Sequence, residues 1–212
     1  MQRKRVAVLI SGRGSNMAAL IEAAKDKDYP AEIALVLSNK VDAGGLGVAR
    51  AAGVATEVVD HAAFGKDRAA FDRALQAVLE KHRIDIVCLA GFMRLLTPEF
   101  VGHWPKRILN IHPALLPAFK GLDTHKRALT AGAKMHGATV HFVVAEMDAG
   151  PIVAQGAVAV HTGDSEAALA ARVLAVEHRI YPAALKLVVE GRVQVVNGQC
   201  LIDGVRVPGS PV

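Results

Sequence analysis

The stretch RVAVLISGRGSN, Arg5–Asn16, indicates the class of fold that this chain adopts. Its first half is almost continuously apolar, which is typical of a strand covered on both faces in a parallel sheet. Its second half, Ser11–Asn16, contains two glycines that allow a tight turn before an amphipathic segment. A buried strand that turns directly into a helix is the repeating unit of a doubly wound α/β sheet.

The same alternation continues through the first half of the chain. Further apolar runs predict strands at residues 32–39, 55–60, 85–91 and 108–112, and amphipathic runs predict helices at 16–25, 45–52 and 67–82. We therefore predict an α/β fold, doubly wound, with a mostly parallel sheet and helices on both faces.

Beyond His112 the pattern changes. Residues 138–144 and 151–160 are apolar runs separated by a short loop, which predicts an antiparallel pair. A long helix is predicted over residues 165–190, with a kink at Pro182. We predict that residues 1–212 form one domain with two lobes, 1–112 and 113–212.

The tail contains two hairpin-turn signals, Asn197-Gly198 and Asp203-Gly204. They predict an antiparallel addition at the C-terminus.

Composition restricts the class of partner. The chain is 52% hydrophobic and 21% charged, as in globular proteins, and its net charge of +5 comes from scattered basic residues. Aromatic residues make up only 4%, so we expect anionic small molecules as ligands and no nucleic acid. The two cysteines form no CxxC motif, and no apolar run approaches the roughly 20 residues that span a bilayer. We expect a cytoplasmic protein that binds no membrane.

The loop Ser11–Asn16 is a candidate anion site. Free N–H groups at the start of a helix attract a phosphate group. Met17 stands where a dinucleotide-binding loop needs its third glycine, and the second strand ends in SNK with no carboxylate for a ribose, so we expect no NAD. We favour a monophosphate site, with a plain tight turn and a satisfied helix cap as the alternative.

The segment Gly91–Leu96 follows the fourth predicted strand, at the edge where open α/β sheets place ligands. Its apolar side chains could wall a slot for a flat ring, and Arg94 could bind a carboxylate. The alternative is a buried turn with an arginine on the surface.

Asn110 and His112 end the fifth predicted strand, where alternation aims both side chains at the same face. A loop of about a dozen residues follows, and Asp148 lies in a later loop. An amide can stabilise an oxyanion, a histidine can move a proton, and a carboxylate favours the charged histidine. Together they indicate catalysis, although Asn110 alone could cap a turn and His112 alone could be a core residue.

Other titratable residues give weaker signals. His136 and His141 lie five positions apart and would point to opposite faces of a strand, so we predict no metal site. Glu177, taken alone in the long helix, is predicted to be solvated.

Eight motifs occur together in this chain. They are VLISGRGSN (8–16), LSNK (37–40), LAGFMRLLTPEF (89–100), LNIHPALLP (109–117), HGATVHFV (136–143), MDAGPI (147–152), GDSE (163–166) and VEHRIYP (176–182). On these motifs the chain resembles the phosphoribosylglycinamide formyltransferases, the folate-dependent transformylases of purine biosynthesis. The Asn-x-His pair with a later Asp is shared with other formyltetrahydrofolate enzymes, whereas the SGxGSN loop and the EHxIYP helix are marks of this family.

The resemblance implies a reaction and a set of site residues. The co-substrate would be 10-formyltetrahydrofolate, with no metal, and the acceptor would be glycinamide ribonucleotide. The implied catalytic residues are Asn110, His112 and Asp148, and the implied ribonucleotide-binding residues are Gly14, Ser15, Asn16 and Glu177. The implied folate-binding residues are Arg68, Met93, Arg94, Leu95, Leu96, Asn110, Val144 and Asp148.

The resemblance also leaves alternatives. A formyltetrahydrofolate deformylase would carry a second histidine where this chain has Pro113, and a phosphoribosyl-ligand binding protein would lack turnover. Asp123 and Thr139 depart from residues common in relatives. We expect small-molecule substrates as partners, a monomer or homodimer, and one cis proline within PALLP.

Overall fold

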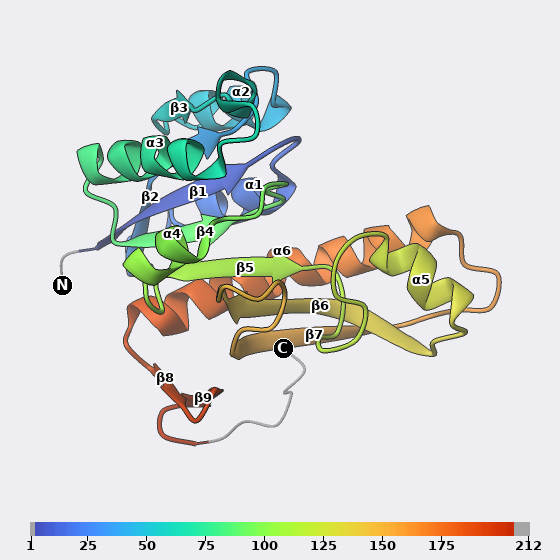
Figure 1. Ribbon diagram of the computed structural model, residues 1–212. Coiled ribbons are helices and arrows are strands. Elements are labelled where there is room, and N and C mark those ends of the chain that lie inside the picture. The colour runs from blue at the N-terminus through green and yellow to red at the C-terminus, as the bar shows by residue number, and fades with distance from the viewer. Residues whose placement is uncertain (1–2, 206–212) are drawn as a thin grey trace. The chain divides into compact units, whose positions relative to one another are not determined.

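The computed structural model describes residues 3–205. Its main sheet has seven strands in the order β3-β2-β1-β4-β5-β6-β7, and a second sheet has two strands, β8 and β9 (Figure 1). The strands are β1 Lys4–Ile10, β2 Ala31–Ser38, β3 Thr56–Val58, β4 Ile86–Leu89, β5 Ile108–His112, β6 Met135–Phe142, β7 Ile152–Ala159, β8 Val193–Val196 and β9 Gln199–Ile202. The helices are α1 Ser15–Ala23, α2 Gly44–Ala51, α3 Arg68–Lys81, α4 Pro98–His103, α5 Thr124–Thr130 and α6 Glu166–Val189, with a 3-10 turn η1 His61–Phe64. The predicted fold class is confirmed.

The chain divides into two compact units between Asn110 and Ile111. The first unit contains the parallel strands, with β1 at the centre between β2 and β4. Every residue from Val6 to Ile10 is completely buried, as the continuous apolar run of β1 predicts. Helix α1 contacts α2, and helix α3 contacts α4.

The second unit is built on the antiparallel pair β6 and β7, which α6 contacts along both strands. Helix and sheet lie very close at Gly156 of β7, where an added Cβ atom would lie 2.2 Å from Cγ1 of Val176. The β8–β9 hairpin turns at Asn197 and Gly198, both of which have positive φ, as the Asn-Gly pair predicts.

Several local features differ from the predictions. The third strand is only three residues long, because the Asp60 side chain accepts a hydrogen bond from the Ala62 N–H and starts η1. Strand β6 begins at Met135, earlier than predicted, and α5 is a helix that the sequence did not predict. Helix α6 continues through Pro182, and the kink expected there stays a prediction.

Two further predictions concern single peptide bonds and the membrane. The Leu116–Pro117 bond is cis, which confirms the expectation for PALLP. Within residues 3–205, no helix is long and apolar enough to cross a membrane.

Candidate functional site

His112 is the last residue of β5 and lies between two acceptor groups. Its Nε2 lies 3.0 Å from the Phe119 carbonyl oxygen, and its Nδ1 lies 3.5 Å from Oδ2 of Asp148. The side chains of His112 and Asp148 are only 6% and 9% exposed. The imidazole thus lies within hydrogen-bond distance of a carbonyl on one side and within ion-pair distance of a carboxylate on the other.

Asp148 lies on the loop between β6 and β7. Its backbone is left-handed, with φ of +52°, and the Gly121 N–H donates to its Oδ2 at 2.9 Å. Its other oxygen, Oδ1, lies 3.7 Å from Nε2 of His141. One carboxylate therefore contacts two imidazoles and the backbone of the segment that follows His112.

His141 contacts Asp148, although its spacing from His136 was considered only for a metal site. It is buried on β6, and its Nδ1 lies 2.9 Å from the Phe142 carbonyl oxygen. Burial lowers the pKa of His141, although the Phe142 carbonyl and Asp148 partly oppose that shift. The signals in the sequence were its place in the motif HGATVHFV and its position seven residues before Asp148.

Two further histidines, His125 and His136, contact each other, and His136 also contacts Phe119. The His125 and His136 rings meet edge to face with centroids 5.2 Å apart, and the His136 ring meets the Phe119 ring at 5.8 Å. Burial is the main cause that lowers the pKa of His136 to about 4, and the neighbouring His125 adds to the shift. Burial also lowers the pKa of His125. The environment of His112 thus includes imidazoles that resist protonation.

The glycine-rich loop lies in the first unit, between β1 and α1. The N-cap of α1 is Gly14, with φ of +74°, so no side chain caps the helix. Gly14, Ser15 and Asn16 are therefore consecutive at an N-terminus whose amides are suited to a phosphate.

Contacts on either side hold this loop in place. The Ser11 hydroxyl donates to Oδ1 of Asn39 at 2.6 Å and accepts from the Met93 N–H at 2.7 Å. The Gly45 N–H donates to the Gly12 carbonyl at 3.0 Å. Ser11 therefore joins the candidate phosphate loop to the candidate folate segment.

The segment Gly91–Leu96 presents apolar side chains to solvent. Met93 is 64% exposed and Leu95 is 59% exposed, whereas the Phe92 ring stacks on Phe71. Arg94 lies over that same Phe71 ring, 5.8 Å from its centroid. Large exposed apolar side chains on a loop at a strand end are typical of a ligand surface.

Arg68 supports this segment from α3. Its Nη2 donates to the Leu95 carbonyl at 2.8 Å and to the Leu96 carbonyl at 3.3 Å. This side chain is thus bound to backbone, in addition to any role toward a ligand.

Two residues of the second unit were also singled out. Glu177 is only 7% exposed, so the interpretation of that residue as solvated was wrong: it lies among the buried residues of α6, near Val176 and Ile180. A buried glutamate is unusual and favours a specific role. Val144 is exposed and lies two residues after the end of β6.

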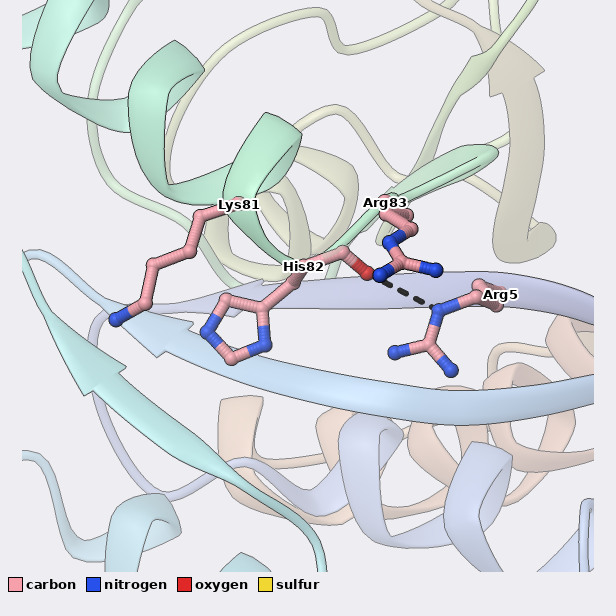
Figure 2. Close-up of a pocket in the computed structure, with 4 residues that line it drawn as sticks. All are labelled: Arg5, Lys81, His82 and Arg83. Carbon is pink, nitrogen blue, oxygen red and sulfur yellow. Dashed lines mark hydrogen bonds between the residues drawn. The ribbon is translucent and has the colours of Figure 1, made fainter.

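A pocket of about 410 Å³ lies elsewhere, lined by Arg5, Lys81, His82 and Arg83 (Figure 2). Three of its four basic residues have partners. Glu57 accepts from Lys81 and His82, which lowers the pKa of Glu57. Arg5 pairs with Glu32 and donates to the His82 carbonyl. Basic residues also suit the C-terminus of α3. None of the predicted site residues lines this pocket.

Among residues 3–205, no group of three or more histidine, cysteine or acidic residues is arranged to hold a metal ion.

Comparisons with known proteins show what this chain is similar to. The formyl transferase family matches residues 4–185. The phosphoribosylglycinamide formyltransferase of Escherichia coli is 46% identical over 203 residues, which covers 96% of this chain and 95% of that protein. The solved structure of phosphoribosylglycinamide formyltransferase from Coxiella burnetii is 40% identical, with a TM-score of 0.92 over 99% of this chain and 98% of that one.

A longer human relative is also similar. The trifunctional purine biosynthetic protein adenosine-3 of Homo sapiens is 51% identical over 193 residues. The match covers 91% of this chain and spans only 19% of the length of that protein.

Proposed function

This chain belongs to the formyl transferase family, and on that premise we propose that it transfers the formyl group of 10-formyltetrahydrofolate to the amine of phosphoribosylglycinamide. The products are the N-formyl ribonucleotide and tetrahydrofolate, a step of purine biosynthesis. The observation that carries the proposal is the buried His112, which lies between the Asp148 carboxylate and the Phe119 carbonyl, two residues after Asn110.

The reaction needs an electrophile, an oxyanion site and a proton path. The amine attacks the formyl carbon, and the carbonyl electron pair moves to oxygen, giving a tetrahedral oxyanion. Collapse of that intermediate breaks the bond from carbon to N10 of the folate; the amine loses one proton and N10 gains one. The Asn110 amide and the protonated His112 stabilise the oxyanion, and Asp148 stabilises the imidazolium.

The first unit supplies residues for both substrates. Gly14, Ser15 and Asn16 start α1 without a side-chain cap, which supports binding of the ribonucleotide phosphate there. Exposed Met93 and Leu95, with Leu96, support binding of the flat pterin. The proposed contacts of Arg68 and Arg94 are with the carboxylates of the folate.

The remaining proposed roles lie in the second unit. Glu177 hydrogen-bonds the ribose or glycinamide part, and Val144 and Asp148 contact the folate. We expect only small-molecule substrates as partners, no nucleic acid or membrane, and a monomer or homodimer in the cytoplasm.

An absorbance assay tests the reaction. Purified protein is mixed with 10-formyltetrahydrofolate, with and without the ribonucleotide, and release of tetrahydrofolate is followed. Release that requires the ribonucleotide supports the transferase. Equal release without it would indicate a deformylase, and no release in either mixture would indicate a binding protein.

The variant His112→Ala tests the assigned catalytic group. We expect kcat to fall by roughly 100- to 10,000-fold, since general acid–base catalysis contributes about that much. The dissociation constant of the ribonucleotide, measured by calorimetry, should change little. The control is His103→Ala, at an exposed histidine on α4. Near-full activity of His112→Ala would show that the assignment is wrong.

A further inference from the structure

The Phe119 carbonyl that faces His112 belongs to the segment Pro113–Phe119, which leaves β5 directly after the histidine. A backbone carbonyl can orient an imidazole only if its own segment is held in place. The contacts of Ala114 and Leu116, midway between His112 and Phe119, show what holds it.

Thr139 on β6 makes the first of these contacts. Its hydroxyl is completely buried, donates to the Ala114 carbonyl at 2.7 Å, and accepts from the Leu116 N–H at 3.1 Å. One hydroxyl therefore binds the backbone on both sides of Leu115.

Gln155 on β7 completes the arrangement. It is the cross-strand partner of Thr139, and its Nε2 lies 2.8 Å from the Leu116 carbonyl and 2.9 Å from Oγ1 of Thr139. Both of these oxygens are acceptors for Nε2, because the Thr139 hydroxyl hydrogen is directed to Ala114. A single nitrogen that donates two hydrogens is what a carboxamide provides and what a carboxylate or a thioether lacks.

The consequence for Leu116 is that its N–H and its carbonyl are both bound by the β6–β7 pair. Three residues later, Phe119 has a left-handed backbone, with φ of +54°, and its carbonyl lies at His112. The segment between them is short and turned, since the Ala118 N–H donates to the Leu115 carbonyl at 3.0 Å.

From this geometry we infer that Gln155 is a positioning residue for the proposed formyl transfer: its carboxamide, acting with the Thr139 hydroxyl, holds the segment whose Phe119 carbonyl orients the His112 ring. Gln155 does not itself touch the reacting atoms. The expected effect on kcat rests on the proposed function. The expected effect on the orientation of the His112 ring does not depend on it.

The first measurement needs no substrate. Nitrogen-15 NMR of the imidazole groups is recorded for the wild type and for Gln155→Met, which keeps the size of the side chain and removes both donors. We expect the His112 Nε2 resonance, assigned with His112→Ala, to move because the Phe119 contact is weakened. The control Gln194→Met, at an exposed position on β8, should leave that resonance unchanged.

The second measurement is steady-state kinetics of the same variants. We expect Gln155→Met to lower kcat by about 10- to 100-fold, because a misplaced catalytic group costs about that much. KM for the ribonucleotide should stay within about twofold of the wild-type value, since the proposed phosphate loop is held by other contacts. Gln155→Glu, which offers only acceptors, should behave like Gln155→Met.

Thr139 provides a second pair of variants if Gln155→Met does not fold. Thr139→Ser keeps the hydroxyl and should retain nearly full kcat, whereas Thr139→Val removes it and should lose kcat about as much as Gln155→Met. In the double variant Gln155→Met/Thr139→Val the losses should be far less than multiplicative, because both residues hold the same segment.

The outcomes separate the two proposals. An unmoved His112 resonance in Gln155→Met, or kcat within twofold of wild type, would overturn the inference. A uniform loss of kcat, ribonucleotide affinity and Tm would overturn it too, since that pattern indicates a general structural defect. A wild-type protein without ribonucleotide-dependent turnover would overturn the proposed function instead, and the NMR result would still decide the role of Gln155.

Discussion

At the scale of single residues, Asp148 makes three contacts within the candidate site. Its carboxylate accepts from the Gly121 N–H and lies beside both His112 and His141. Its backbone has φ of +52°, a conformation that aspartate and asparagine adopt more readily than other side chains with a Cβ atom. The residue therefore combines a left-handed loop conformation with a charge in a buried setting.

The variant Asp148→Asn separates these two properties. Asparagine retains the left-handed backbone and can still accept from Gly121, but it removes the negative charge beside His112. We expect kcat to fall by roughly 100-fold or more, because the imidazolium loses its counter-charge, while Tm changes little. Initial-rate kinetics and thermal unfolding measure the two effects.

A matched control lies in the neighbouring segment. Asp123→Asn makes the same chemical change at an exposed position whose φ is +55°, and its side chain caps no helix. That variant should keep wild-type kcat. If Asp148→Asn also kept kcat within threefold, Asp148 would have no catalytic role through its charge.

At the scale of elements, α2 and the glycine-rich loop are in direct contact. A Cβ atom at Gly45, in the first turn of α2, would lie 2.6 Å from Cδ1 of Ile10 and 3.1 Å from the Gly12 carbonyl oxygen. Ile10 is completely buried, so it has little room to move. The loop backbone must therefore shift if Gly45 gains a side chain.

The variant Gly45→Ala should raise KM for the ribonucleotide by about tenfold and leave kcat nearly unchanged, because the displaced loop is the proposed phosphate site. It should also destabilise the protein by about 1–3 kcal/mol through overpacking. Gly47→Ala, on the same helix with nothing within 4 Å of its added Cβ, is the control. There, alanine should stabilise the helix by about 0.5–1 kcal/mol without affecting KM. Equal effects of the two substitutions on KM would contradict the contact argument.

The strands were more predictable than the loops that connect them. Burial on both faces leaves a continuous apolar run in the sequence, so β1 and β5 could be predicted, β5 with its observed bounds. Helix α5 was not predicted, because it is only seven residues long and its N-cap residue, Asp123, makes no side-chain cap hydrogen bond. The sequence therefore carries no clear start signal for this helix.

The candidate site could also be predicted only in part. Asn110, His112 and Asp148 carry recognisable chemistry in their side chains, so the sequence could single them out. The Phe119 carbonyl could not be predicted, because every residue has a carbonyl and only the fold brings this one to His112. Glu177 was misjudged because its neighbours in α6 did not reveal which face of the helix is buried.

At the scale of the whole molecule, three histidines that are buried or half-buried link stability to pH. Burial is the main cause that lowers the pKa values of His125, His136 and His141, and that of His136 falls to about 4. In the unfolded chain these groups would titrate near pH 6.5. Between about pH 4 and 6.5 the unfolded chain therefore binds more protons than the folded protein, so the free energy of unfolding rises with pH across this window and falls on acidification.

His136 should account for a measurable part of this dependence. A shift from 6.5 to about 4 corresponds to about 3 kcal/mol at most, lost as pH falls through the window. The variant His136→Phe keeps a ring against Phe119 and cannot be protonated, so its free energy of unfolding should change less between pH 7 and pH 4.5 than that of the wild type. Urea unfolding at a series of pH values measures the difference, with His103→Phe at an exposed site as the control. We expect the free energy of unfolding of His136→Phe to depend on pH less steeply than that of the wild type, but still to depend on it, because His125 and His141 still take up protons on unfolding. An unchanged pH dependence would mean that His136 is not neutral in the folded protein.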